Sequence, residues 1–373
     1  MKFKSINFTC KSCGGPLQYV PATNSLVCSF CSTSQPIEKS NEEIVEHDFK
    51  EALNSLNVHK TQKFEREIKC SKCSATFTIT PYSVSTNCPY CHTPAITEFT
   101  QPIKPESILP FSISQKEAQE KFRKWIGSLW FAPKELKDFV DGHQKLLGYY
   151  LPYWTYDAKT ITRYRGQRGD IYYVTVKRRV MINGREQIVN QREPRIHWTP
   201  VQGVVYNDFD DITIEASKTV SHTILDGLAP WNTHKLVPFN EKYLSGFESE
   251  EYTIGLDNGF EYAKMKMDIT IHQSIRRDIG GDQQQIDSKQ TQYKDVTYKS
   301  TLFPIWTAKF KWKGKTYNYA INGQTGKVVG ERPYSWLKIT LFVIMVASIL
   351  AGIFWFLQEH PQYVENIRMF LTH

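Results

Sequence analysis

The chain has 373 residues and a formal net charge of +8 at pH 7, a length sufficient for two or three domains. Aromatic residues make up 13% of the chain, which is enough for a sizeable core and excludes an intrinsically disordered protein. The mean hydropathy of −0.44 is that of a soluble protein, although one segment near the C-terminus departs strongly from this average.

Eight cysteines form four Cys-x-x-Cys pairs in two matching sets. In each set fourteen residues separate the two pairs, and the second set follows the first at an offset of sixty. Four thiolates from two such pairs form the tetrahedron of a closed structural zinc site. The expected ligands are Cys10, Cys13, Cys28 and Cys31, and then Cys70, Cys73, Cys88 and Cys91. We therefore predict zinc ribbons over residues 1–38 and 68–98, with two structural zinc ions.

Two other interpretations use the same cysteines. A rubredoxin-like iron site has similar knuckles, and the spacing does not exclude it. Disulfides need an oxidising compartment, and residues 1–7 lack the apolar core of a signal peptide. A site with four protein thiolates leaves no open coordination position, so its metal is expected to hold the fold and not to catalyse.

Local signals predict several helices. Residues 40–43 (SNEE) read as a capping box, which predicts a helix over about 41–56 inside a helical linker, residues 39–67. Residues 114–117 (SQKE) form a second capping box before an apolar stripe, and Pro133 is expected to open another short helix.

Residues 105–335 are predicted to form an α+β body with mostly antiparallel strands. Alternating apolar residues before Asn183 and Gly184 predict a hairpin with a type I′ turn, half exposed because its return strand is polar. Apolar residues three or four apart predict one long amphipathic helix over 256–279. Further strands are expected over residues 198–206, 212–216, 301–312, 315–321 and 328–329.

Residues 339–357 form a stretch of nineteen residues without a charge. At about 1.5 Å per residue, a helix of this length spans roughly the hydrocarbon core of a bilayer. Trp336 and Trp355 lie near its ends, where interfacial aromatic residues are found. We predict a single transmembrane helix over residues 338–358 and a short external tail, residues 359–373. A buried helix of a soluble protein is the alternative.

The flanking charges predict the orientation of this helix. Lys327, Arg332 and Lys338 precede it, whereas Arg368 is the single basic residue among Lys and Arg that follows it. The positive-inside rule then places the N-terminal head in the cytoplasm, where thiols stay reduced and available to metal. The expected location is the cytoplasmic (inner) membrane, with one span.

The positive charge is concentrated in residues 159–195, which carry ten Lys or Arg against three Asp or Glu. Runs of charged residues usually form no more than a solvent-exposed surface. The sharper hypothesis is contact with anionic lipid of the cytoplasmic leaflet, and nucleic acid could use the same patch. The residues concerned are Arg163, Arg165, Arg168, Lys177, Arg178, Arg179, Arg185, Arg192 and Arg195.

No catalytic motif is found: the sequence lacks a P-loop, a GxSxG and an HExxH pattern. His222, His234 and His272 are scattered and not at ligand spacing, so surface or core positions are expected for them. Asp208, Asp210 and Asp211 could bind a cation, but a solvated turn is the expected structure. We therefore predict that the protein is not an enzyme. A hydrolase is the third alternative, and it would need a polar pocket that the sequence does not indicate.

Several motifs carry a resemblance to a known family: residues 151–157, 164–173, 198–203, 243–247, 302–306 and 322–335. With the cysteine ribbons, which resemble the zinc ribbon of transcription factor B, they resemble a bacterial family of membrane-anchored zinc-ribbon proteins. These are often labelled primosomal protein N-prime or helicase-like, but this sequence has no Walker motif. Some relatives accompany phage-shock-like and flotillin-like proteins in membrane-stress gene clusters, so the resemblance implies partners of these kinds.

The sequence thus predicts a non-enzymatic, zinc-binding, membrane-anchored adaptor that recruits cytoplasmic or membrane protein partners, with a role in membrane stress. A membrane-tethered nucleic-acid-binding protein is the alternative. The ribbons are almost neutral, which disfavours nucleic acid, whereas the basic stretch with Tyr164, Tyr172 and Tyr173 favours it.

Overall fold

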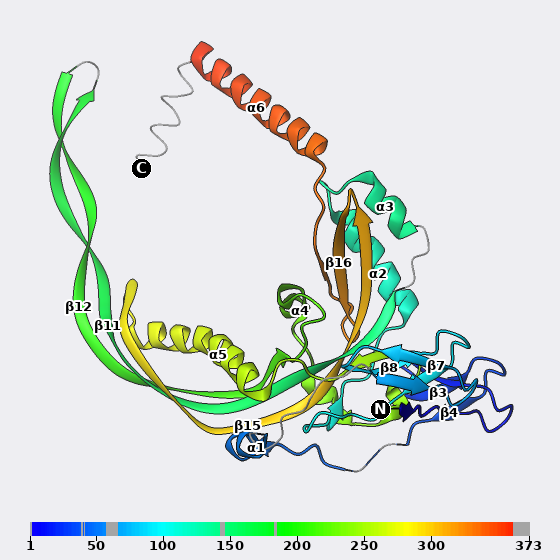
Figure 1. Ribbon diagram of the computed structural model, residues 1–373. Helices are drawn as coiled ribbons and strands as arrows, with labels where there is room; N and C mark the ends of the chain where they lie inside the picture. Colours follow the sequence, from blue (N-terminus) through cyan, green and yellow to red (C-terminus); the bar gives the residue numbers. More distant parts are fainter. Residues whose placement is uncertain are drawn as a thin grey trace.

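The computed structural model describes residues 2–38, 40, 42–56, 66–141, 146–182 and 185–360. Within these ranges the chain is a sheet-rich α+β protein with one apolar helix at its C-terminal end, which confirms the predicted class. The two cysteine ribbons lie at one end of the body, and a long hairpin extends from the other (Figure 1).

Three very long strands form an arched sheet through the body (Figure 1). Strand β11, Leu147–Ile182, pairs antiparallel with β12, Arg185–Glu215, and its other edge pairs antiparallel with β15, Gln283–Trp312. The predicted strands at 198–206 and 212–216 are therefore parts of one strand. The strand predicted at 301–312 begins at residue 283, because the polar residues 283–300 are held by backbone pairing and not by apolar periodicity.

The outer part of the hairpin has no third strand among the described residues. Pairing between β15 and β11 ends where Gly169 lies opposite Gln283. Beyond this point only β11 and β12 pair, and we call residues 170–182 and 185–197 the free ribbon. It is about 40 Å long at 3.3 Å per residue. The paired strands confirm the predicted hairpin, whose turn at residues 183 and 184 lies outside the described residues.

Helix α5, Leu256–Ile279, lies on the concave side of the arch and confirms the predicted amphipathic helix (Figure 1). Trp154 and Tyr156 of β11 pack beneath it. The Trp154 indole N–H donates to the Ile254 carbonyl (3.0 Å), and the Tyr156 hydroxyl donates to the Leu256 carbonyl (2.7 Å). Both aromatic side chains are thus buried with their polar atoms satisfied. The buried α5 side chains are Leu256, Phe260, Ala263, Met267, Ile271, Ile275 and Ile279.

The linker helix is shorter than predicted. Strand β5, His47–Asp48, pairs with β15, and helix α1 spans only Phe49–Leu56. The Asp48 carboxylate accepts a hydrogen bond from the Glu51 N–H (2.9 Å), so the helix is capped at residue 48. The predicted capping box at residues 40–43 was wrong, because the chain pairs with the sheet before it turns into the helix.

Helices α2 (Gln115–Ser128) and α3 (Lys134–Asp141) lie at the end of the sheet that carries β16 (Lys315–Asn322) and β17 (Val328–Gly330), away from the free ribbon (Figure 1). Helix α2 has the predicted capping box at Ser114, and α3 follows Pro133 as predicted. The remaining body elements are β10 (Ser107–Ile108), α4 (His222–Leu228), β13 (Val237–Pro238), β14 (Glu248–Glu250) and 3₁₀ turns over Thr233–Lys235 and Glu241–Leu244. Strands β16 and β17 extend the sheet beyond β15, close to the predicted positions.

Each ribbon is a small antiparallel unit. The first contains β2 (Leu17–Val20), β3 (Ser25–Cys28) and β4 (Ser34–Pro36). The second contains β6 (Arg66–Lys69), β7 (Thr76–Ile79), β8 (Ser83–Asn87) and β9 (Pro94–Ile96). Strand β1, Lys2–Lys4, pairs in parallel with β6, so the start of the chain completes the second ribbon and not the first.

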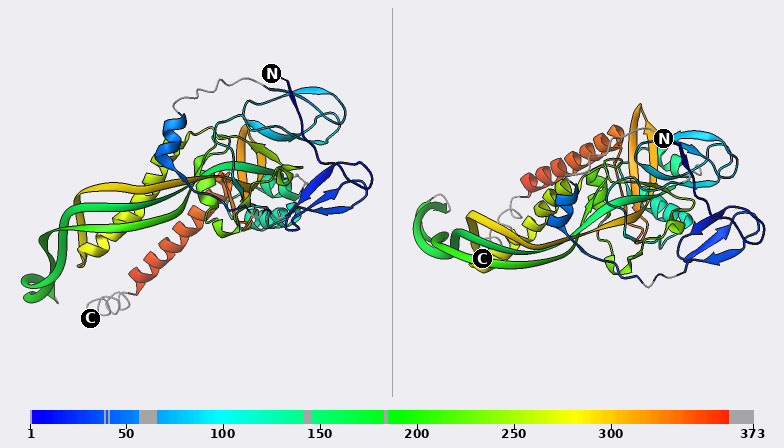
Figure 2. Two further views of the ribbon diagram at one scale, coloured as in Figure 1. Left: turned by 90° about the horizontal axis from the view of Figure 1, so that it is seen from below. Right: turned by 60° about the horizontal axis from the view of Figure 1, so that its bottom comes forward.

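Helix α6, Trp336–Glu359, contains the predicted span and has no buried residue. Its 18-residue window of mean hydropathy 2.5 makes it long and apolar enough to cross a membrane. The lack of any buried residue distinguishes it from the core helix of a soluble protein. Figures 1 and 2 show α6 and the free ribbon extending from the body toward the same side. Residues 361–373 of the predicted tail lie outside the described residues.

Candidate metal centres

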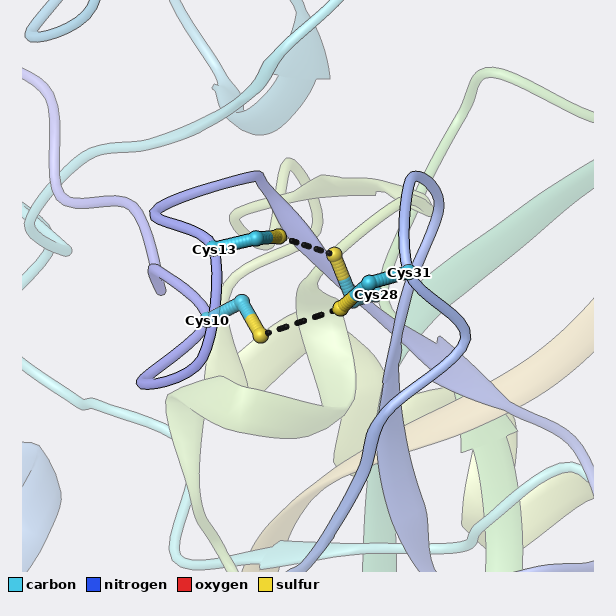
Figure 3. A group of neighbouring side chains, drawn as sticks. All are labelled: Cys10, Cys13, Cys28 and Cys31. Carbon is cyan, nitrogen blue, oxygen red and sulfur yellow. Dashed lines mark hydrogen bonds between the residues drawn. The ribbon is translucent and has the colours of Figure 1, made fainter.

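The structure brings each predicted set of four cysteines together. In the first ribbon the sulfurs of Cys10 and Cys31 lie 3.6 Å apart, and those of Cys13 and Cys28 lie 3.4 Å apart (Figure 3). In the second ribbon, the Cys70–Cys91 and Cys73–Cys88 distances are 3.7 and 3.8 Å. All eight thiols are free. Since a disulfide bond is about 2.05 Å long, the disulfide interpretation does not describe this structure.

These sulfur positions fit a metal ion. A tetrahedron with metal–sulfur bonds of about 2.3 Å has edges of roughly 3.8 Å. The four observed distances lie at or slightly below this edge. Each set therefore provides a complete sphere of four soft ligands, with no place for a water or a substrate. Either site could hold a metal ion, and neither geometry offers it an open catalytic position.

The four knuckles share one backbone design. After the second cysteine of each pair comes a residue with a positive φ, whose N–H donates to the carbonyl of the first cysteine at 2.9–3.0 Å. The N–H of the first cysteine in turn donates to the carbonyl one residue further on, at 2.7–3.0 Å. This pair of backbone hydrogen bonds closes the turn that carries both sulfurs. The positive-φ residues are Gly14, Ser32, Ser74 and His92.

Without a cation, the four thiols of the first ribbon cannot all ionise. The side chain and then the backbone N–H of Thr33 lower the pKa of Cys31 to about 6. The Gly15 backbone lowers the pKa of Cys13, but the sulfurs of Cys31 and Cys28 outweigh it and raise that pKa to about 12. Neighbouring thiolates repel one another, so full ionisation requires a bound positive charge.

Residues 243–251, which we call the seat segment, carry most of the contacts between the first ribbon and the body. Outside the seat segment, the Ala22 N–H donates to the Phe111 carbonyl (3.0 Å). The Tyr19 N–H donates to the Ser245 carbonyl (2.9 Å), and the Ser245 hydroxyl donates to the Leu17 carbonyl (2.7 Å). The Tyr19 ring lies 5.1 Å from the Tyr243 ring, nearly edge to face. Strands of the ribbon thus form part of the main apolar core.

The second ribbon contacts the same segment from another side. Strand β8 pairs antiparallel with β14 inside the seat segment, and the Ser85 hydroxyl donates to the Phe247 carbonyl (2.8 Å). Arg66 and Glu251 form an ion pair at 2.6 Å, with side chains only 7% and 1% exposed. The Glu251 carboxylate also accepts from the Gln101 N–H at 3.0 Å. This buried charge is paired and hydrogen-bonded, as burial requires.

An acidic group that sequence reasoning placed in a solvated turn lies within β12 instead. Asp210 and Asp211 lie opposite a register shift in the sheet and approach Asp157 of β11. The Asp211 N–H donates to the Asp157 carboxylate at 2.6 Å, and burial raises the pKa of Asp157 to about 6. Lys299 lies 2.8 Å from Asp211 and 3.1 Å from Glu46, so a side-chain cation offsets part of the negative charge of this group.

A second mixed group, Glu215, His222 and Asp226, was not predicted from the sequence, because these residues follow no recognised ligand spacing. Of the three histidines considered, His222 contacts the buried Glu215 carboxylate, and its Nε2 atom lies 3.6 Å from Asp226. Lys266 of α5 lies 2.6 Å from Asp226. Each acidic group thus already contacts a lysine, whereas each cysteine set is a complete shell of four soft ligands. The cysteine sets are therefore the stronger candidate metal sites among the described residues.

The register of the hairpin sorts its basic residues onto two faces, because alternate residues point to opposite sides of a strand. The face of Arg163 carries Arg163, Arg165, Lys177, Arg179 and Arg192. The face of Arg168 carries Arg168, Arg178 and Arg195.

Ion pairs neutralise these two faces unequally. On the Arg168 face, Arg168 pairs with Asp170 at 3.0 Å and Arg178 with Glu193 at 2.8 Å. On the Arg163 face, Arg179 lies 3.8 Å from Glu186, and Arg192 stacks over the Tyr173 ring at 5.1 Å without losing its charge. The Arg163 face therefore keeps most of its positive charge.

The chain is similar to an uncharacterised protein, YdjG, of Bacillus subtilis (strain 168). The two are 26% identical over 247 residues, a match that spans 66% of this chain and 69% of that protein. No family model matches the chain. No solved structure matches it. The likeness shows a distant relative of unassigned function and leaves the expected zinc-ribbon family a proposal.

The separate ligand sets give a prediction. Cys10→Ser should empty the first site and leave the second occupied, so the bound metal should fall from two ions per chain to one. Amide exchange should accelerate in β2 and β3, since the metal supplies folding free energy to so small a unit.

The matched control is Ser12→Ala in the same knuckle. Its side chain is not a ligand, and its backbone N–H still donates to the Cys10 sulfur, as it does now at 3.4 Å. Loss of both ions in Cys10→Ser, or of one in Ser12→Ala, would contradict the assignment.

Proposed function

We propose that this protein is a non-enzymatic adaptor, anchored in the cytoplasmic membrane by α6 and stabilised by two structural zinc ions. Zinc is the proposed metal because both sets are complete tetrahedra of thiolates, which it binds without redox chemistry. An iron site of the rubredoxin type is the competing assignment. No step of catalysis is assigned to any residue.

The observation that carries the adaptor proposal is the free ribbon. Isolated two-stranded ribbons are marginally stable in water, and this one extends beyond its sheet without a third strand among the described residues. It also exposes large side chains: Tyr173 is 59% exposed and Ile188 is 67% exposed. Such a ribbon is well suited to gain stability from another molecule that packs along it.

The cytoplasmic head orientation rests on the flanking charges. Lys327, Arg332 and Lys338 precede the apolar helix, and such residues are enriched on the cytoplasmic side. The free ribbon and α6 extend toward the same side of the body, so a membrane crossed by α6 lies within reach of the ribbon (Figures 1 and 2). This arrangement favours anionic lipid over nucleic acid as the ligand of the basic residues in the free ribbon.

The proposed protein partners are cytoplasmic or membrane proteins of the phage-shock-like or flotillin-like kinds. This proposal rests on the family resemblance of the sequence motifs. Affinity purification of the full chain from detergent-solubilised membranes should recover such a protein in stoichiometric amounts. A chain that purifies alone from cross-linked membranes would contradict the adaptor role.

The two faces of the hairpin supply a matched pair of charge variants. One replaces Arg163, Lys177 and Arg192 by Ala; the other replaces Arg168, Arg178 and Arg195 by Ala. Each Lys or Arg near an anionic surface contributes about 1 kcal/mol, so the first variant should weaken lipid contact by roughly a hundredfold. The second removes as many charges from the partly neutralised face and should weaken it far less.

The measurement is amide exchange of the free ribbon in the full chain, held in nanodiscs of anionic or neutral lipid. We expect protection in anionic discs that salt and the first variant remove. Protection by added duplex DNA, and not by anionic lipid, would favour the nucleic-acid alternative. Equal exchange under all conditions would leave the basic residues as a solvated surface.

A further inference from the structure

The loop between α2 and α3 exposes aromatic surface beside the start of α6. Trp130 at its tip is 77% exposed, although tryptophan side chains are on average highly buried. Across from it, Trp336 and Leu337 of α6 are 84% and 71% exposed. These side chains form an apolar patch where the proposed membrane helix leaves the body.

This loop is held firmly against α6. The Ser335 N–H donates to the Phe131 carbonyl at 2.8 Å. The Lys338 ammonium donates to the Ala132 carbonyl at 2.7 Å and to the Trp130 carbonyl at 3.3 Å. The loop carbonyls therefore bind the last basic residue before the apolar segment, and loop and helix move as one unit at this point.

An aromatic contact shows how far along α6 the loop lies. The Phe131 and Phe342 rings meet at 5.6 Å in a nearly perpendicular arrangement. Phe342 lies six residues after Trp336, which is about 9 Å along a helix axis. It also lies inside the charge-free segment that begins at residue 339. The loop thus lies beside the first turns of the segment that enters the hydrocarbon.

The charges around this patch complement a phospholipid surface. Arg332 stacks its guanidinium over the Trp125 ring at 5.6 Å, and Lys338 lies between the loop and the helix. Basic side chains at the cytoplasmic end of a span lie at headgroup level, and tryptophan prefers the same level. The loop has an apolar tip and basic flanks, and it is continuous with α6. All three features fit contact with a phospholipid surface.

We propose that the loop of residues 129–132 inserts Trp130 into the headgroup interface of the bilayer that α6 crosses. The ligand is the phospholipid surface, and the loop is a second membrane contact beside the span. This inference rests on the proposed membrane anchor. Two contacts prevent the head from rotating about α6, and so fix which face of the hairpin meets the membrane.

The test replaces single exposed residues of the full chain by the photoreactive p-benzoylphenylalanine, in liposomes, and detects lipid adducts by mass spectrometry. Trp130 is the test position, and Leu341 of α6, which is 59% exposed, reports the span. Tyr90, an exposed aromatic residue of the second ribbon, is the matched control away from α6. All three positions are exposed, so none of the replacements disturbs packing.

We expect lipid adducts at positions 130 and 341, with yields at least about tenfold above that at position 90, as for side chains held at the interface. Adducts at 341 but not at 130 would overturn the loop inference and leave the span intact. No adduct at 341 would mean that the anchor itself is wrong. Equal yields at 130 and 90 would also overturn the inference, because labelling would not be specific to the loop.

Discussion

The convergence of four cysteine sulfurs in each ribbon, at distances that fit one bound cation, is the constraint on which the head of this protein depends. Each ribbon has few apolar residues of its own, so metal binding supplies much of its folding free energy. The ribbons are also joined to the body: Tyr19 of the first packs into the main core, and Arg66 of the second pairs with Glu251. Both contacts meet in the seat segment, residues 243–251. If metal is bound as proposed, its loss would therefore affect a junction of the body and not two detached appendages.

From this junction the arched sheet extends in one direction toward the free ribbon. Its inner side is stabilised by α5 over the aromatic residues of β11, where Trp154 and Tyr156 bury both their rings and their hydrogen bonds. Beyond the C-terminus of α5 and the first residue of β15, the sheet has no apolar layer packed against it among the described residues. The remaining ribbon is held by backbone pairing and by ion pairs such as Arg178–Glu193. The part of the sheet with the least internal support is thus the part with the most exposed charge.

The sequence predicted both cysteine clusters because their pattern is local: two Cys-x-x-Cys pairs at a fixed spacing suffice. The long helix over 256–279 was equally clear from its apolar period. The prediction from the sequence failed at residues 283–300, because these residues are polar and form a strand only through pairing with the distant strand β11. It also missed the seat segment and the cap at Asp48. The cations of the acidic groups, Lys299 and Lys266, come from remote segments, and no local pattern links them to their partners.

The central claim is that two thiolate-bound zinc ions hold the head together. The most direct measurement is the metal content of the full chain, purified in detergent under reducing conditions, combined with X-ray absorption at the metal edge. The account predicts two zinc ions per chain, each with four sulfur ligands at about 2.3 Å. Fewer than two zinc ions, stoichiometric iron, or nitrogen and oxygen ligands in place of sulfur would contradict it.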